Sequence, residues 1–173
     1  MKIEKIYLTK DNLKKIKKID DLYYKGENKT DLNWYLERFS SKHIGYVLLN
    51  GKSEYIGYII SVPVKKELYD ALIGGVLVND ININPDMFIN KSKYNYIVSF
   101  VILEEYRHMG LGVELIKNII NIVDKGYYCA LTISKEGAGV AKKFMHLKKQ
   151  INDDVAVFEI KLWLLLNKCP YRF

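Results

Sequence analysis

The stretch Arg107-His108-Met109-Gly110-Leu111-Gly112 connects a predicted strand to a predicted helix, and the rest of the chain is interpreted outward from it. Upstream, the apolar, β-branched run from Tyr96 to Leu103 is typical of a strand. Downstream, apolar residues recur at helical spacing from Leu111 to Val123. Glycine lets a backbone approach a ligand closely, and the first turn of a helix carries unpaired N–H groups and the positive end of the helix dipole. The stretch therefore predicts a main-chain anion site that suits phosphate.

The two glycines of this stretch fit more than one kind of loop. The dinucleotide-binding fingerprint needs a third glycine, but Glu114 and Leu115 stand there. A P-loop needs a Gly-Lys-Ser/Thr ending, which is missing. Two interpretations stay open: a simple strand-to-helix turn that needs a left-handed residue, and a diphosphate cradle with Arg107 three residues before its first glycine.

Length and composition describe one packed domain over residues 1–173. The chain is 49% hydrophobic and 13% aromatic, which is enough for one core. Its length of 173 residues is too short for two typical domains. The formal net charge of +7 comes mainly from lysines that are spread along the whole chain. A nucleic-acid surface would gather Lys and Arg with aromatic residues on one face, so we do not expect nucleic acid as a partner.

Cysteines, histidines and apolar segments exclude several classes of protein. Cys129 and Cys169 are too few for a disulfide framework, and with the three histidines they show no metal-ligand spacing, so no metal site is predicted. No apolar segment approaches the roughly 20 residues that a membrane helix needs, and the N-terminus lacks an apolar leader. We expect a cytoplasmic protein without membrane association, with Cys129 as a small core residue in a strand.

The predicted element order is β-α-α-β-β-insert-β-α-β-α-β-β, which indicates an α+β layered domain with a mixed sheet. Thr9 or Asp11 is expected to cap the first helix and Asp31 the second. Asn50-Gly51 is expected to supply the positive φ angles of a tight hairpin turn. The remaining segments are expected as strands at 3–8, 44–49, 55–62, 94–103 and 127–133, an insert over about 65–92 with a short helix at 66–72, a helix from 111 to about 124, a last helix from Ser134 or Glu136 to about Leu147, and closing strands that turn at 152–154.

The run from Val101 to Gly112 resembles motif A of the GCN5-related N-acetyltransferases (GNAT superfamily). It has their apolar strand, their Tyr-Arg pair at Tyr106-Arg107 and their Gly-x-Gly at the helix start. Glu104 stands where the family usually has proline, and His108 where it usually has a small residue. The resemblance extends through the element order over essentially the full chain. It implies a mostly antiparallel central sheet of six to seven strands flanked by about four helices, with a splayed strand pair that forms the CoA cleft.

The resemblance also implies how acetyl-CoA would bind as co-substrate. Strand backbone groups would pair with the pantetheine, and amides at the helix start would bind the diphosphate with Arg107 beside it. The last helix, over Ala138 to Phe144, would flank the pantetheine, and Lys142 and Lys143 either reach the ribose phosphate or lie on a solvated face. The residues that are expected to contact the cofactor are Phe100, Val101, Ile102, Arg107, His108, Met109, Gly110, Leu111, Gly112 and Val113.

The implied chemistry is direct attack of a neutral amine on the thioester, with the amide N–H of about Ile102 as oxyanion donor. A free amine has a pKa near 10.4, so a base or a desolvating pocket must take its proton. The family's tyrosine acid and glutamate base correspond here to Phe144 and Tyr96, so no catalytic residue is assigned. A thiol with a pKa near 8.5 can leave without an acid. The groups left open as proton acceptors are Glu67, Asp70, Asp80 and Asp86 in the insert, and His146, which is otherwise a surface or packing residue.

The insert is expected to cover the acceptor side. Its bulky residues Tyr69, Met87 and Phe88 either form an acceptor wall or pack on the sheet edge. The sequence has no dense acidic cluster, which argues against a polycationic aminoglycoside. The leading hypothesis is acetyl transfer to a primary amine of a small molecule or peptide; the alternative is a catalytically weak or inactive CoA-binding or regulatory domain. A homodimer through the closing strands and the apolar segment Trp163 to Leu166 is a further expectation.

Overall fold

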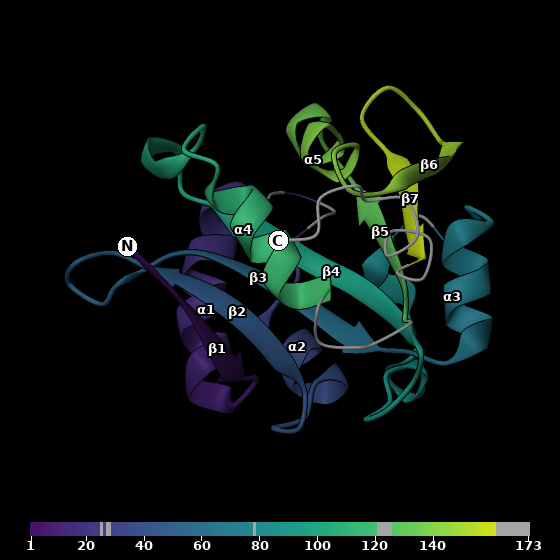
Figure 1. The fold of residues 1–173 in the computed structure, drawn as a ribbon. Coiled ribbons are helices and arrows are strands. Elements are labelled where there is room, and N and C mark those ends of the chain that lie inside the picture. Colours follow the sequence, from purple (N-terminus) through teal and green to yellow (C-terminus); the bar gives the residue numbers. More distant parts are fainter. Residues whose placement is uncertain (25, 27–28, 78, 121–125, 162–173) are drawn as a thin grey trace.

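The computed structural model describes residues 1–24, 26, 29–77, 79–120 and 126–161. Within these residues the chain forms a seven-stranded sheet in the order β1-β2-β3-β4-β5-β7-β6 (Figure 1). Neighbouring strands are antiparallel except β4 and β5, which run parallel. The strands are β1 (Lys2–Tyr7), β2 (Ile44–Leu49), β3 (Tyr55–Pro63), β4 (Tyr94–Ile102), β5 (Tyr127–Thr132), β6 (His146–Gln150) and β7 (Ala156–Lys161).

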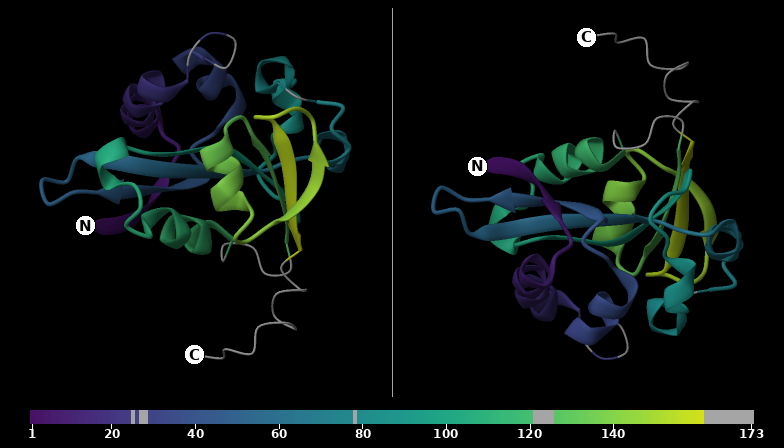
Figure 2. Two further views of the ribbon diagram at one scale, coloured as in Figure 1. Left: turned by 90° about the horizontal axis from the view of Figure 1, so that it is seen from above. Right: turned by 90° about the horizontal axis from the view of Figure 1, so that it is seen from below.

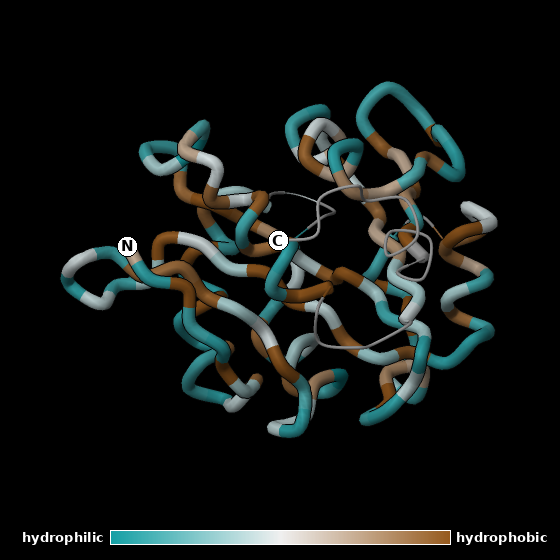
Figure 3. Tube along the Cα trace, viewed as in Figure 1, coloured by the Kyte–Doolittle hydropathy of each residue, from teal (hydrophilic) through white to brown (hydrophobic). Residues whose placement is uncertain are grey.

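Helices cover both faces of this sheet. The first three α-helices pack on one face and α4 packs on the other (Figure 2), and each face has its own hydrophobic cluster. Brown, apolar residues follow the strands and the inner sides of the helices, whereas the connecting loops are mostly hydrophilic (Figure 3). The described helices are α1 (Lys10–Tyr23), α2 (Leu32–Arg38), α3 (Lys66–Ile73), α4 (Leu111–Ile120) and α5 (Lys135–Ala141), with short 3-10 turns η2 (Asp80–Asn82), η3 (Pro85–Met87) and η4 (Glu104–Tyr106).

This architecture confirms the predicted fold class, including the element order and the mostly antiparallel mixed sheet. Side-chain caps fix several helix starts: Thr9 accepts from the Asn12 N–H at 3.4 Å, and Asp31 accepts from the Trp34 N–H at 2.7 Å. Ser134 caps α5 in the same way. Each such cap satisfies an N–H group that the helix leaves unpaired, which is why these polar residues mark the boundaries. Cys129 is buried in β5, as expected.

Two local predictions are wrong. The last helix ends at Ala141 instead of continuing to about Leu147, and a turn leads into β6. Residues Val140, Phe144 and Leu147 have helical spacing, but Leu147 pairs with β7 and is exposed. The hairpin after β2 takes its positive φ from Ser53, at 60°, and not from Asn50-Gly51, because the Asn50 side chain instead accepts from the N–H groups of Lys52 and Glu54.

Two further expectations fall outside the described residues. They are the extension of α4 from Ile120 to about residue 124, and the apolar segment 163–166 on which the proposed dimer depends. Among the described residues, no helix is both long and apolar enough to cross a membrane. The same residues contain no cluster of three or more His, Cys, Asp or Glu side chains that could hold a metal ion.

Candidate active site

The central parallel strands separate part-way along their length. β4 and β5 pair from Tyr94↔Tyr127 to Ile97↔Ala130, and no later pair joins them in the described part of the chain. The separation begins at an irregularity in β4, because Ile97 and Ser99 pair with consecutive residues of β3 and Val98 is left over. Such a β-bulge bends a strand and ends regular pairing. The structure therefore contains the splayed strand pair that the resemblance implied.

Along β4, the backbone N–H and C=O groups of every second residue point into this gap. The Leu103 N–H donates to the Ile56 carbonyl of β3 at 2.9 Å. Because successive residues of an antiparallel strand point to opposite neighbours, Val101 also faces β3, whereas Phe100 and Ile102 face the gap. The Ile102 carbonyl agrees with this direction, since it accepts from Arg107 Nε at 3.0 Å and not from β3. The Phe100 N–H interacts with the Tyr24 hydroxyl, so the Phe100 carbonyl and the Ile102 N–H are the groups left for a ligand, and Val101 serves the sheet.

The loop before α4 has the conformation of an anion-binding loop. His108 and Gly110 both have positive φ, at 63° and 78°, and both residues are exposed. The Gly110 carbonyl accepts from the N–H of Val113 at 3.0 Å and of Glu114 at 3.3 Å, so it begins α4 and uses the Val113 donor internally. Within the described structure, no hydrogen bond engages the N–H groups of residues 108–112. These donors are available to a phosphate at the positive end of α4.

Gly112 lets α4 approach β4 closely. A Cβ at this position would lie 3.0 Å from Phe100 Cζ and 3.5 Å from Ile102 Cδ1. At Gly110 a Cβ would meet only open space, and there glycine is required by its left-handed backbone. The first glycine therefore sets the loop conformation, and the second seats the helix on the strand.

Arg107 folds back onto the protein. Besides its bond to Ile102, its guanidinium carbon lies 4.8 Å from the centre of the Tyr23 ring, in the arrangement of a cation–π contact. Arg107 thus fixes the end of β4 to the loop, and the diphosphate contact that the resemblance implied stays a prediction. Phe144 lies in the turn after α5 and packs on the cluster below α4. Lys142 and Lys143 are exposed.

A cavity of about 60 Å³ lies on the other face of the sheet, at the point where β4 and β5 separate. Val98 and Ser99 of β4 contribute to it, as do Leu131 and Ile133 at the end of β5. Its remaining walls come from α1, α2, the segment after α1 and the insert. These lining residues are Asp20, Tyr24, Thr30, Trp34, Tyr35, Asn79, Asp80 and Ile81.

Asp20 is a buried residue of this cavity that binds side chains from several elements. Its side chain is 1% exposed. Oδ2 accepts from Tyr35 at 2.9 Å and lies 3.5 Å from Lys17 Nζ. Oδ1 accepts from the Tyr58 hydroxyl, which also lies 2.7 Å from Ser99 Oγ. Both oxygens are therefore engaged, and Asp20 holds α1, α2, β3 and β4 together.

Asp80 has a different environment. Its Oδ1 accepts from the Tyr96 hydroxyl at 2.5 Å, whereas Oδ2 makes no hydrogen bond with any described residue. Burial raises the pKa of Asp80 to about 6, against the opposing effect of the hydrogen bond from Tyr96. Burial also raises the pKa of Tyr96 well above its ordinary value, so this tyrosine stays protonated and donates. The residue at the family's glutamate position thus holds a carboxylate that the insert supplies.

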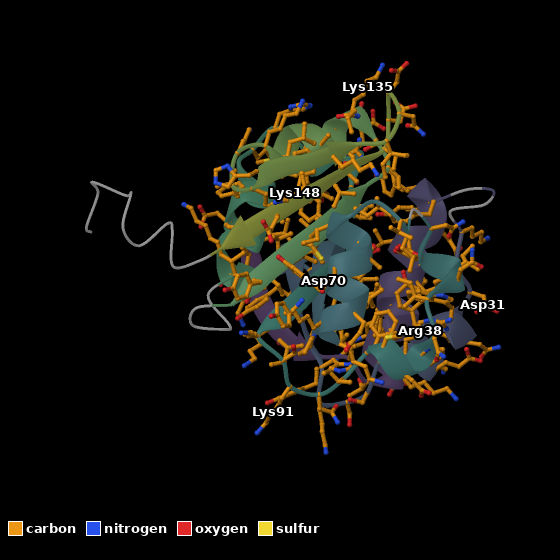
Figure 4. The ribbon with its side chains drawn as sticks, turned by 90° about the vertical axis from the view of Figure 1, so that its right-hand side faces the viewer. Asp31, Arg38, Asp70, Lys91, Lys135 and Lys148 are labelled. Carbon is orange, nitrogen blue, oxygen red and sulfur yellow. The ribbon has the colours of Figure 1, made fainter. Side chains whose placement is uncertain are left out.

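The other acidic candidates of the insert lie elsewhere. Glu67, Asp70 and Asp86 are exposed, and Asp70 lies on the outer side of α3 (Figure 4), paired with Lys66. His146 is exposed at the start of β6.

The bulky side chains of the insert pack on the protein. Tyr69 and Phe88 are buried, and Tyr69 donates to Glu159 at 2.6 Å. Met87 packs against the same cluster as these two residues. The bulky residues of the insert therefore pack on the sheet and do not line the cavity. The aromatic wall of the cavity is formed by Tyr24, Trp34 and Tyr35.

Sequence reasoning missed Asp20 and this aromatic wall. One signal was present: Asp20 continues the face of α1 that carries Leu13 and Ile16, which makes it a polar residue on a buried stripe. Trp34 also lines the cavity, and its indole N–H is buried without a hydrogen-bond partner among the described residues. Such unused buried donors are uncommon in folded proteins.

Comparison with known proteins assigns the family. The model of the acetyltransferase (GNAT) family matches residues 13–142, and the chain belongs to this family. No curated protein sequence matches it significantly.

Solved structures with the same fold include the loading GNATL domain of CurA from Lyngbya majuscula (TM-score 0.71, 11% identity, covering 95% of this chain and 100% of that one). Another is the GphF GNAT-like decarboxylase with isobutyryl-CoA (0.69, 8%, 94% and 100%). A third is Arabidopsis thaliana NAA60 with acetyl-CoA (0.61, 11%, 92% and 99%). These identities show the fold alone, and these structures include both a loading domain and a decarboxylase.

Proposed function

We propose that this chain is an N-acetyltransferase, which transfers an acetyl group from acetyl-CoA to a primary amine of a small molecule or peptide by direct attack. The observation that carries the proposal is the gap between β4 and β5, with unused amides at one end and an acidic, aromatic cavity on the opposite face. A thioester lying in such a gap can be reached by an amine from the cavity. Both substrates of a direct transfer therefore have a place beside the same strand.

The proposed roles follow from the donors that the fold leaves unused. The N–H groups of residues 108–112 bind the diphosphate at the start of α4. The Phe100 carbonyl pairs with the pantetheine arm, and the Ile102 N–H stabilises the negative charge that develops on the carbonyl oxygen. A preorganised donor of this kind contributes about 2.7–4 kcal/mol to transition-state stabilisation in acyl transfer. Phe144 has no proton to give, so the thiol leaves as thiolate and takes its proton from the attacking nitrogen.

Calorimetric titration with acetyl-CoA tests the cofactor site. The wild-type chain should bind at tens of micromolar or tighter, and Gly110→Asp should lose binding because it places a carboxylate in an anion-binding loop. Gly110→Ala causes a similar backbone strain without the charge, so its smaller effect separates charge from conformation. Gly26→Asp is a matched control, since Gly26 also has positive φ, at 57°, with open space around it.

Three outcomes distinguish the alternatives. Binding together with turnover of an amine supports the proposal. Binding without turnover over a broad amine panel favours a catalytically weak or inactive CoA-binding domain. Absence of binding in the wild-type chain rejects the cofactor assignment altogether.

A further inference from the structure

On the basis of the proposed function, we infer that the acceptor is a compact primary amine with one ammonium group and no carboxylate, and that Asp80 Oδ2 binds this group and accepts its proton. Asp80 touches the reacting nitrogen in this arrangement, so it is a catalytic residue. Asp20 acts through its neighbours and is a positioning residue. The inference rests on the cavity, its charge and the unequal use of its two carboxylates.

The charge of the cavity selects a cation. Its described lining contains the carboxylates of Asp20 and Asp80 and no lysine, arginine or histidine. Two cations lie behind this lining: Lys17 is 3.5 Å from Asp20 and closer to Asp21, at 2.7 Å, and the Arg38 guanidinium stacks on the Trp34 ring at 4.6 Å. An ammonium group is attracted by this lining, whereas a carboxylate on the acceptor is repelled.

The number of available oxygens selects a single ammonium group. Tyr35, Tyr58 and Lys17 use both oxygens of Asp20. Asp80 uses only Oδ1, toward Tyr96, which leaves Oδ2 for the acceptor. The further ammonium groups of a polyamine would find no free carboxylate oxygen in the described lining. An apolar or aromatic body packs against the rings of Tyr24, Trp34 and Tyr35.

The position of the cavity places the nitrogen near the thioester. Val98 and Ser99 line it, and these residues lie at the bulge where β4 leaves β5. Phe100, whose backbone faces the gap, follows directly along the strand. An amine that enters beside Asp80 therefore meets the gap at the segment to which the pantetheine is assigned.

The proton transfer balances without another reactant. The ammonium group gives one proton to Asp80 Oδ2, and the resulting neutral amine attacks the thioester carbonyl to form the C–N bond. Collapse of the tetrahedral intermediate breaks the C–S bond, and the second proton on nitrogen passes to the thiolate sulfur. The products are an N-acetylamine and CoA thiol, and Asp80 returns its proton to solvent.

Three groups that face Asp80 stay neutral while it titrates: Tyr96 from β4, Tyr24 from the end of α1 and Cys129 from β5. The carboxylate of Asp20, from α1, lines the same cavity. Burial raises the pKa of Tyr24 to about 12 and that of the Cys129 thiol well above its ordinary value. With its pKa of about 6, Asp80 is ionised at neutral pH and is ready to accept a proton.

The test compares phenethylamine, phenylalanine and spermidine as acceptors with saturating acetyl-CoA. Phenethylamine should be acetylated with the highest kcat/KM, phenylalanine should fall at least about tenfold below it because of its carboxylate, and spermidine should be poorer too. Preference for phenylalanine or spermidine would overturn the assigned substrate class, and so would acetyl-CoA binding without turnover of any of the three.

Asp80→Asn keeps an acceptor for Tyr96 but cannot take a proton. It should lower kcat/KM for phenethylamine by about 10²–10⁴-fold and leave the Kd for acetyl-CoA unchanged. Asp86→Asn, in the same insert but exposed, is the matched control and should retain full activity. The wild-type kcat/KM should rise with pH through about 6. Tyr96→Phe should move this limb to higher pH, because it removes a hydrogen bond that favours the carboxylate.

These outcomes separate the inference from the function on which it rests. An unchanged pH limb in Asp80→Asn, with normal turnover, rejects Asp80 as base and leaves the acetyltransferase proposal standing. A wild-type chain that fails to bind acetyl-CoA rejects both. Titration of phenethylamine into the CoA complex gives a readout without turnover, and its binding should be lost in Asp80→Asn.

Discussion

Replacing Gly112 by alanine tests whether α4 rests directly on β4. Alanine is favoured over glycine in a helix by at most about 1 kcal/mol. Here the new methyl group would lie 3.0 Å from Phe100 Cζ, closer than carbon atoms pack, so the ring or the helix must shift. Overpacking of this kind costs about 1–3 kcal/mol. Because overpacking costs more than the gain in helix propensity, we expect a net loss of stability of up to about 2 kcal/mol for Gly112→Ala.

Gly139→Ala is the matched control, because Gly139 also lies in a helix and its added Cβ would meet only open space. It should gain up to about 1 kcal/mol in the free energy of unfolding, measured by urea denaturation. A double-mutant cycle with Phe100→Leu should recover at least about 1 kcal/mol of the loss at Gly112, since the shorter side chain makes room. Equal stabilisation by both alanine variants would refute the close approach of helix and strand.

The remaining predictions concern buried charge and backbone strain. Tyr58→Phe removes a donor to the buried Asp20 carboxylate and should lower the free energy of unfolding by about 1.5–3 kcal/mol; a loss under about 0.5 kcal/mol in chemical denaturation would contradict this role. Ser53→Gly should raise the melting temperature, because it relieves a left-handed φ of 60° in an exposed turn, a strain of about 1 kcal/mol. Asp80→Asn should stabilise the fold above pH 6, because the folded-state pKa of about 6 exceeds the ordinary 3.8 and the wild-type chain loses stability as pH rises between these values. The difference, about 3 kcal/mol at most, should vanish below pH 4 in denaturation curves measured across pH.

The sequence was sufficient for the features that local chemistry determines. Thr9, Asp31 and Ser134 mark helix starts because a cap acts on N–H groups two or three residues away. The glycines at 110 and 112 were recognisable because their spacing reflects a backbone requirement of the same few residues. The helix predicted to reach Leu147 failed for the complementary reason, since β7 is a non-local partner that overrides helical spacing.

The acidic cavity lay beyond such local reasoning. Asp20 and Asp80 come from different segments and meet only because α1 and the insert pack on the same face of β4. Tyr96 shows the difficulty most clearly: by its position alone it marks the loss of a base. In the structure its hydroxyl holds the Asp80 carboxylate at 2.5 Å, so that a carboxylate is still present at the gap. Under the mechanism proposed above, the base comes from the insert and the strand position keeps a supporting role.

The bulge at Val98 links the two halves of the site. It ends pairing with β5, which opens the gap, and it also shifts the alternation of β4 so that Val98 and Ser99 both line the cavity on the α1 side. Ser99 Oγ then lies 2.7 Å from the Tyr58 hydroxyl, which donates to Asp20. The hydrogen-bonded network around Asp20 therefore includes Ser99, the residue that directly follows the bulge. Because Ser99 belongs to both the bulge and the network, we expect the gap and the carboxylates of the cavity to be positioned together, and the proposed direct transfer between two substrates requires such preorganisation.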